Sequence, residues 1–166
     1  MVGRYAEMIG RALALPPDEL VELAYAGRVH DVGKIFVPER IVSKTGTLTE
    51  EEYTQMKMHA RIGAEIVGTI PGSVMLQKAV EHHHEAFDGS GYPNGLRGEE
   101  IPLWGRILAW ADAFVNMTTE RSFAPAKTPE QALAEIEKLS GTRYDGMLVR
   151  VLLRQLRTGK APSLGD

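Results

Sequence analysis

Apolar side chains recur along most of this chain at every third or fourth position, the spacing that places them on one face of an α-helix. Prolines, glycines and short polar stretches interrupt the pattern and mark the ends of segments. We therefore expect helices over residues 5–15, 17–29, 49–68, 72–84, 102–117, 128–139 and 144–156. No segment reads as a confident strand, so the predicted class is an all-α bundle of about six to seven helices.

The segments between these helices carry their own signals. Thr49 followed by Glu52 is a capping box, in which each residue satisfies a backbone N–H of the other. Gly33 breaks the helical pattern, and residues 34–38 are expected to be extended. Residues 88–95 are rich in glycine, asparagine, aspartate and proline, which predicts a shaped loop.

Composition limits the kinds of site that the chain can hold. Its 166 residues fit one domain, and the formal net charge of -3 argues against DNA or RNA as a partner. The absence of cysteine excludes disulfides and thiolate metal sites, so any metal must be held by nitrogen and oxygen. The apolar stretches are too short to span a membrane and no signal peptide is evident, so we expect a cytoplasmic location without membrane contact.

His30 and Asp31 stand side by side where a predicted helix gives way to Gly33. Neighbouring side chains converge on one ion only where the backbone leaves regular helical geometry, as it does at a helix end. The carboxylate can also bridge two ions. For an isolated pair, a helix cap with a surface aspartate is the more common explanation.

His59 and Asp112 each lie in the apolar stripe of a predicted helix. An inward-facing histidine needs hydrogen-bond partners or a metal, and a buried unpaired carboxylate is costly. A satisfied core histidine and a salt bridge to an arginine are the competing explanations.

The histidines at 82, 83 and 84 end another predicted helix. His83 shares the face of Ala79 and Val80, and His84 borders it. Periodicity alone does not exclude His82, and the run could equally be a solvated polar end of the helix.

Taken together, separate helices each bring a histidine or an aspartate to an inward face. Imidazole and carboxylate suit iron, manganese, zinc or nickel. A bundle centre of this kind can hold two ions about 3.5–4 Å apart and hydrolyse phosphoesters.

The same residues resemble a known family. Residues 30–34, His-Asp-Val-Gly-Lys, resemble the signature of the HD superfamily of metal-dependent phosphohydrolases. Residues 83–85, His-His-Glu, followed by Asp-Gly-Ser-Gly-Tyr-Pro at 88–93, are similar to the signature of its HD-GYP subgroup. The resemblance implies an HD-GYP domain over residues 1–157 that lacks the usual N-terminal helix of the subgroup, with a flexible tail at 158–166.

The resemblance also implies an activity. Members hydrolyse cyclic di-GMP to pGpG, and some continue to GMP, by attack of a metal-activated hydroxide. Asp31 would bridge two divalent ions, with iron or manganese expected and zinc or nickel left open. Carried over position by position, the metal ligands would be His30, Asp31, His59, His83, His84 and Asp112.

Four further residues take roles from the resemblance. Lys34 would stabilise charge on the phosphate, Gly91 and Tyr92 would shape the guanine-binding loop, and Arg121 would hold a ligand phosphate. GGDEF-type or response-regulator domains are the implied partners, and the last helix could serve either the core or a homodimer. The missing N-terminal ligands and Ala124, where the subgroup has a basic residue, favour the alternative of a cyclic di-GMP receptor or interaction module with weak catalysis. The altered neighbourhood of Arg121 keeps a second alternative, a phosphohydrolase of another nucleotide.

Overall fold

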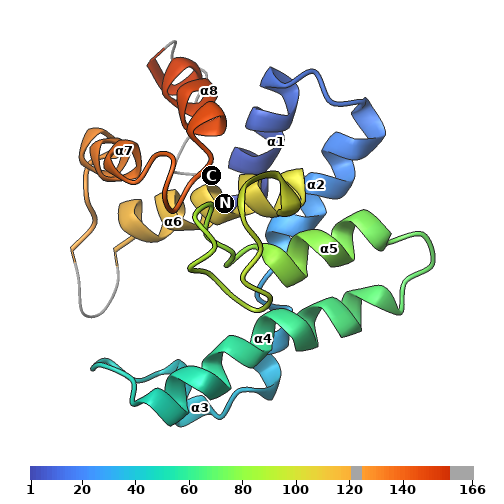
Figure 1. Ribbon diagram of the computed structural model, residues 1–166, viewed down its shortest axis with the longest axis vertical. Helices are drawn as coiled ribbons and strands as arrows, with labels where there is room; N and C mark the ends of the chain where they lie inside the picture. Colours follow the sequence, from blue (N-terminus) through green and yellow to red (C-terminus); the bar gives the residue numbers. More distant parts are fainter. Residues whose placement is uncertain (121–124, 158–166) are drawn as a thin grey trace.

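The computed structural model describes residues 1–120 and 125–157, and these form helices joined by loops (Figure 1). Between the described residues there is no β-strand beyond an isolated bridge from Ser140 to Tyr144, so the all-α prediction is confirmed. The α-helices are α1 (Val2–Ala12), α2 (Pro17–Val29), α3 (Glu39–Val42), α4 (Glu50–Gly68), α5 (Val74–His82), α6 (Leu103–Thr118), α7 (Pro129–Lys138) and α8 (Gly146–Arg157). Two short 3-10 helices are η1 (Val32–Phe36) and η2 (Gly98–Glu100).

Most predicted helices are found within a few residues of their expected bounds, and the exceptions have local causes. The expectation of an extended segment over 34–38 was wrong for residues 34–36, which belong to η1, with Lys34 N–H donating to Asp31 O at 2.9 Å and Val37 N–H to Lys34 O at 3.0 Å; the backbone is extended at Val37 and Pro38. The four-residue helix α3 was not predicted. The first helix begins and ends three residues earlier than expected and is followed by Ala14 at a φ of 57°.

Helix α6 lies at the centre of the fold, between α1, α2 and α5 on one side and α7 on the other (Figure 1). It is apolar nearly all round, which is the pattern of a helix buried on every side. Its buried side chains include Trp104, Ile107, Leu108, Trp110 and Phe114. Tyr5 of α1 packs edge-on against Phe114, with ring centroids 5.0 Å apart.

Helices α4 and α5 form an antiparallel pair against α2, η1 and α6. The predicted capping box starts α4: Glu52 N–H donates to Thr49 Oγ1 at 3.2 Å, and Thr49 N–H donates to Glu52 Oε2 at 2.8 Å. This pair carries His59 near the middle of α4 and the histidine run at the end of α5. The fold thus brings the candidate ligands toward one region.

A buried ion pair joins α6 to the start of α8. Arg106 Nη1 lies 2.6 Å from Asp145 Oδ2, and Asp145 Oδ1 also accepts the backbone N–H of Met147 at 2.8 Å. The Asp145 side chain is 6% exposed. A carboxylate at this depth needs both partners, so the pair holds the beginning of α8 to the central helix.

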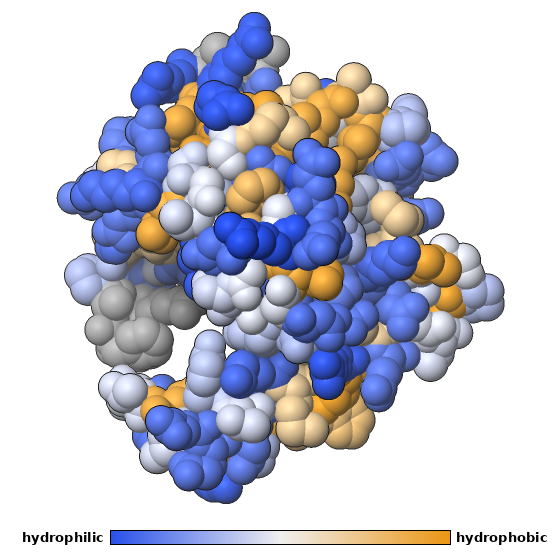
Figure 2. Space-filling model, in the orientation of Figure 1, coloured by the Kyte–Doolittle hydropathy of each residue, from blue (hydrophilic) through white to orange (hydrophobic). Residues whose placement is uncertain are grey.

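Hydrophilic side chains cover most of the face seen in Figure 2, with smaller hydrophobic areas between them. Within the described ranges, none of the helices is long and apolar enough to cross a membrane.

Candidate metal centre

The His-Asp motif sits where α2 ends and η1 begins, tight against α4. Gly33 makes this approach feasible, because a Cβ at this position would overlap the carbonyl oxygen of His59 and crowd the backbone nitrogen of Gly63. Gly63 in turn lies against η1. The two glycines therefore bring Asp31 and His59 to neighbouring positions.

The carboxylate of Asp31 is the hub of the cluster. Its Oδ1 lies 3.4 Å from Nε2 of His59 and 4.0 Å from Nε2 of His83. Its Oδ2 lies 3.4 Å from Nε2 of His30 and 2.6 Å from Nζ of Lys34. Each oxygen of Asp31 therefore faces a different histidine set.

The first set surrounds Oδ1 of Asp31. Asp31, His59, His83 and His84 each offer a ligand atom, and these atoms lie within 4.8 Å of one another. They come from η1, α4 and the end of α5, which explains why no single sequence segment reveals the set. Such a group has the donor types and spacing of a divalent-metal site.

The second set surrounds His30. Its Nε2 lies 3.4 Å from Asp112 Oδ1 on α6, the same distance as from Asp31 Oδ2. The other oxygen of Asp112 accepts a hydrogen bond from Asn116 Nδ2 at 2.9 Å. Asp112 thus directs one oxygen toward His30. A carboxylate in the apolar stripe of a helix needs partners, and here they are His30 and Asn116.

Three of the histidines are oriented by the same local contact. The Nδ1 atoms of His30, His59 and His83 lie 3.0, 2.6 and 2.6 Å from the carbonyl oxygens of Gly27, Met56 and Val80, three residues earlier in each case. A carbonyl oxygen can only accept, so Nδ1 carries the proton in each ring. The lone pair of Nε2 is then free to bind a metal ion, provided that this nitrogen is not protonated.

Several buried atoms of the cluster have no hydrogen-bond partner among the described residues. They are Nε2 of His30, His59 and His83, and Oδ1 of Asp31. Buried polar atoms are rarely left in this state, and cations bound at the two sets would satisfy them. The residues present therefore fit a divalent metal ion, and the protein has a candidate metal-binding cluster at this position.

The carboxylates perturb the first histidine of the motif. Burial opposes protonation of His30, but Asp112 and Asp31 outweigh it and raise the pKa of His30 to about 9. Burial likewise opposes ionisation of Asp31, yet His30 and Lys34 hold the pKa of Asp31 far below its usual range. A cation is thus strongly favoured between these carboxylates, and a bound metal would take the place of the His30 proton.

The other histidines favour the neutral form. Burial lowers the pKa of His59, and burial together with the charge of His30 lowers the pKa of His83 to about 3. Burial also lowers the pKa of His84, with His83 adding to the effect. Neutral imidazole is the form that binds metals, so this part of the cluster is ready for an ion at neutral pH.

The loop at 88–95 folds over the end of α5 beside the cluster. Tyr92 stacks on the ring of His84, with centroids 4.8 Å apart and an interplanar angle of 27°. A Cβ on Gly91 would overlap the backbone of Glu85 and Ala86, so glycine is required for the loop to lie this close. Gly91 and Tyr92 therefore do shape a loop next to the candidate ligands.

One residue quoted in the signature received no role from the sequence. Glu85 is buried, and its carboxylate accepts the backbone N–H groups of Asn94 at 2.7 Å and Leu96 at 3.1 Å. The sequence signal that could have revealed its role is the position of this glutamate, directly after two histidine ligands and shortly before a glycine-rich loop. His82, which periodicity alone did not exclude, is buried but is not a member of the metal-binding group of described residues.

Two features predicted from the sequence fall outside the residues that the structure describes. Arg121 and the neighbouring Ala124 lie outside the described residues, as does the predicted tail at 158–166. Their predicted roles stay predictions from the sequence.

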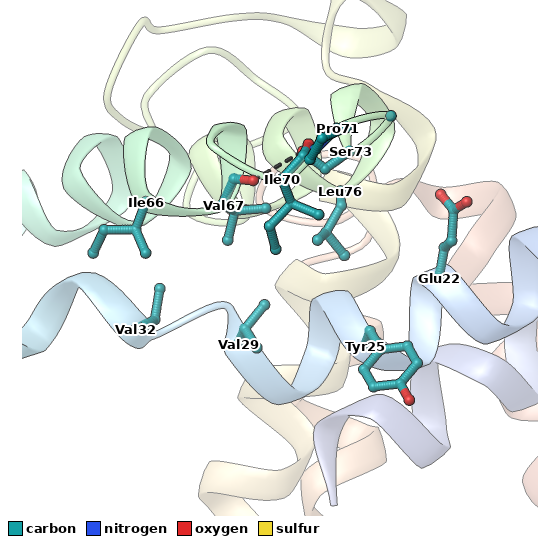
Figure 3. A pocket seen from close by; sticks show the side chains of 11 residues that line it. Glu22, Tyr25, Val29, Val32, Ile66, Val67, Ile70, Pro71, Ser73 and Leu76 are labelled. Atoms are coloured by element: carbon teal, nitrogen blue, oxygen red, sulfur yellow. Dashed lines mark hydrogen bonds between the residues drawn. The ribbon is translucent and has the colours of Figure 1, made fainter.

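A separate groove of about 480 Å³ lies between α2 and the α4–α5 pair (Figure 3). Val29 and Val32, which flank the His-Asp motif in sequence, line one wall, and Ile66, Val67 and Ile70 line the opposite wall. Its lining is mostly apolar, with Glu22 and Ser73 among the polar members, and it contains none of the candidate ligands.

Comparison with known proteins agrees with this geometry. A family model described as the HD domain matches residues 1–148. The cyclic di-GMP phosphodiesterase of Thermotoga maritima is 42% identical over 155 residues, covering 92% of this chain and 41% of that protein. The cyclic di-GMP phosphodiesterase response regulator RpfG of Xanthomonas campestris pv. campestris is 39% identical over 151 residues, covering 90% of this chain and 40% of that protein.

Other relatives act on a mixed dinucleotide. The 3'3'-cGAMP-specific phosphodiesterase 2 of Vibrio cholerae is 36% identical over 154 residues, covering 92% of this chain and 30% of that protein. The chain thus spans well under half the length of these curated relatives.

Solved structures share the fold. The crystal structure of the cyclic GMP-AMP-specific phosphodiesterase V-cGAP3 of V. cholerae matches with a TM-score of 0.75 at 20% identity, over 96% of this chain and 43% of that one. The HDG"Y"P protein Bd1817 of Bdellovibrio bacteriovorus matches with a TM-score of 0.71 at 17% identity, over 94% of this chain and 51% of that one. The resemblance to HD-GYP proteins is confirmed, and the chain belongs to the HD domain family.

Proposed function

We propose that this domain is a metal-dependent phosphodiesterase that hydrolyses cyclic di-GMP to pGpG. The observation that carries the proposal is the position of Asp31, whose two carboxylate oxygens face separate ligand sets, one with the unpartnered Nε2 of His59 and the other with the unpartnered Nε2 of His30. The chain is 42% identical to a cyclic di-GMP phosphodiesterase, and this similarity supports the choice of substrate.

Two divalent ions fit this arrangement better than one. One would bind Oδ1 of Asp31 with His59, His83 and His84, and the other would bind Oδ2 with His30 and Asp112. Purely nitrogen and oxygen donors suit iron or manganese, and they also accept zinc or nickel. Such a pair of ions supplies a nucleophilic water at neutral pH and positive charge beside the phosphate oxygens.

The chain's own residues then bind and orient the substrate. The side chains of Asp31 and Lys34 are 37% and 36% exposed, so the cluster opens to solvent where Lys34 lies. An entering phosphate would meet the ammonium group of Lys34, which donates to a phosphate oxygen and stabilises the charge that develops in the transition state. Arg121 would hold the second phosphate, as the family resemblance implies.

The loop beside the cluster would bind the base. Tyr92 lies against His84 and is partly exposed, so it can bound the space next to the reacting phosphate. Gly91 keeps the loop close to the end of α5. A guanine would therefore lie beside this loop, next to Tyr92.

Partner domains follow from the same similarity. The relative RpfG is a response regulator, and this chain covers 40% of it. We propose that the domain works under the control of a signalling domain of the response-regulator or GGDEF type. A homodimer stays a prediction, and the apolar residues Leu148, Val149 and Leu152 of α8 are buried in the core of the chain itself.

The test is turnover by the reconstituted protein. The domain is loaded anaerobically with Fe(II) or Mn(II), incubated with cyclic di-GMP or with 3'3'-cGAMP, and the products are separated by chromatography. We expect pGpG from cyclic di-GMP, and we expect Asp31→Ala to abolish its formation. Asp18→Ala, which removes an exposed carboxylate at the start of α2, is the matched control.

Each other outcome selects another function. Binding of cyclic di-GMP by the metal-loaded protein without cleavage would identify a receptor. Cleavage of 3'3'-cGAMP in preference to cyclic di-GMP would identify a phosphohydrolase of another nucleotide, which the similarity to a cGAMP-specific enzyme makes a concrete competitor.

A further inference from the structure

The segment at 88–98 contains the loop that carries Tyr92. Every second backbone N–H from residue 92 to residue 98 donates a hydrogen bond to the end of α5 or to the residues just after it. The N–H of Tyr92 donates to the His84 carbonyl at 3.2 Å, and that of Gly98 donates to the Phe87 carbonyl at 2.9 Å. Between them, the N–H groups of Asn94 and Leu96 donate to Oε1 and Oε2 of Glu85. The central part of the loop therefore depends on one carboxylate.

This carboxylate is fully enclosed. The side chain of Glu85 is 0% exposed, and Nδ1 of His82 lies 3.8 Å from its Oε1, beyond hydrogen-bond distance. A buried carboxylate is costly unless several donors satisfy it. Because the two loop amides are the donors recorded for it, Glu85 and the loop stabilise each other.

Glu85 also connects this loop to the metal centre. It directly follows His83 and His84, and the ring of His84 carries Tyr92. A weaker contact holds the loop from outside, where Arg61 Nη2 donates to Asn94 Oδ1 at 3.0 Å. The buried carboxylate is thus the inner anchor of the loop, and Arg61 of α4 is an outer one.

We propose that Glu85 is a positioning residue for substrate recognition: it fixes the loop so that Tyr92 stays over His84 and bounds the site for a cyclic dinucleotide. This inference rests on the proposed function for its substrate. Glu85 is enclosed, both of its oxygens accept loop amides, and it is not a member of the metal-binding group of described residues, so its effect must pass through the loop.

The charge of Glu85 is the property to test. A glutamine has the same shape but offers one oxygen and one NH₂ group, so it can accept from one loop amide and must face the other with a donor. A buried amide left without an acceptor in this way loses its hydration without compensation. Glu85→Gln should therefore loosen the loop without removing any metal ligand.

The experiment compares Glu85→Gln with Glu99→Gln, the same change at an exposed position in η2. Three properties of the manganese-loaded proteins are measured: trypsin cleavage after Arg97, kinetics with cyclic di-GMP, and hydrolysis of bis(p-nitrophenyl) phosphate. Arg97 is exposed and lies in the 88–98 segment, so cleavage of the peptide bond after it reports local opening of this segment. Metal content and helical circular dichroism are recorded for each protein.

For Glu85→Gln we expect cleavage after Arg97 to become about fivefold faster or more. KM for cyclic di-GMP should rise about tenfold, with kcat changed by less than about threefold, because binding of the whole nucleotide is weakened rather than the chemical step. Hydrolysis of the small diester and metal content should stay within about twofold of wild type. Glu99→Gln should match wild type throughout.

Unchanged cleavage after Arg97 together with an unchanged KM would overturn the proposal. Equal losses with both diesters and a loss of metal would also overturn it, because Glu85 would then support the ligands and not recognition. If Glu85→Gln does not fold, the same measurements on Glu85→Asp, which keeps the charge and shortens the reach, should show smaller changes in the same direction, and no change would overturn the proposal. If the wild-type domain leaves cyclic di-GMP intact, the proposed function fails, while the protease measurement still tests the anchor.

Discussion

His59 and Asp31 face each other across the contact between α4 and η1, with 3.4 Å between Nε2 of His59 and Oδ1 of Asp31. Neither atom has a hydrogen-bond partner among the described residues. The contact joins two segments that are distant in sequence, and it makes metal content a sensitive measure of the local packing.

The first prediction concerns the number of ions. Wild-type protein should retain about two divalent ions per chain after gel filtration in metal-free buffer, as expected of a two-metal site. Asp112→Asn should retain about one, because this change weakens only the set around His30. Elemental analysis by mass spectrometry measures both, with Asp18→Asn as the control that keeps the full content. A single ion in wild type, or two in Asp112→Asn, would contradict the division into two sets.

The second prediction concerns the contact between η1 and α4. Gly33→Ala places a methyl group against the backbone of His59 and Gly63, so the two segments must separate. We expect the free energy of unfolding to fall by about 2–4 kcal/mol, and metal affinity to fall with it. Urea denaturation checks the first and metal titration the second. Gly46→Ala is the matched control, because nothing lies within 4 Å of a Cβ there; equal stability of the two variants would show that the contact tolerates a side chain.

The third prediction concerns Lys34. Its ammonium group lies 2.6 Å from Asp31 Oδ2 at the open side of the cluster. Lys34→Met should lower kcat for cyclic di-GMP by about 100-fold, because a positioned positive charge beside the phosphate is lost, while metal content is kept. Lys78→Met, at an exposed position of α5, should retain wild-type kinetics. An unchanged kcat would remove Lys34 from the reaction.

The fourth prediction concerns the pair between Arg106 and Asp145. Arg106→Met leaves the buried carboxylate of Asp145 without its cation, so we expect a loss of about 3–5 kcal/mol in the free energy of unfolding. The double variant with Asp145→Asn should lose less than the sum of the two single variants, as coupled residues do. Additive losses in urea denaturation would show that the two side chains act independently.

Sequence periodicity predicts most of this fold because the helices are amphipathic and their ends carry local signals. Thr49 and Glu52 form the predicted capping box, and the apolar α6 is the central helix. Periodicity fails at residues 34–36, which form part of η1 beside the tertiary contact between Gly33 and α4. A close approach of this kind leaves no periodic pattern in the sequence.

The candidate ligands were predictable to a similar degree. Apolar stripes pointed to His59 and Asp112, and both lie at the cluster in the structure. Periodicity could not separate His82 from its neighbours, because the helix ends there and the ring directions are set by the turn that follows. Glu85 was missed for a related reason, since its partners are backbone amides of a loop, and amides are invisible in a side-chain pattern.

The Nδ1 atoms of His30, His59 and His83 are each hydrogen-bonded to a carbonyl oxygen. These bonds reduce the entropy that the side chains would lose on binding a metal ion. Their rings lose rotational freedom when the chain folds, so little side-chain freedom remains to be lost when an ion arrives. The cluster would then be a rigid site. It would favour ions that accept its fixed arrangement of ligand atoms, because the side chains cannot rearrange to suit each ion.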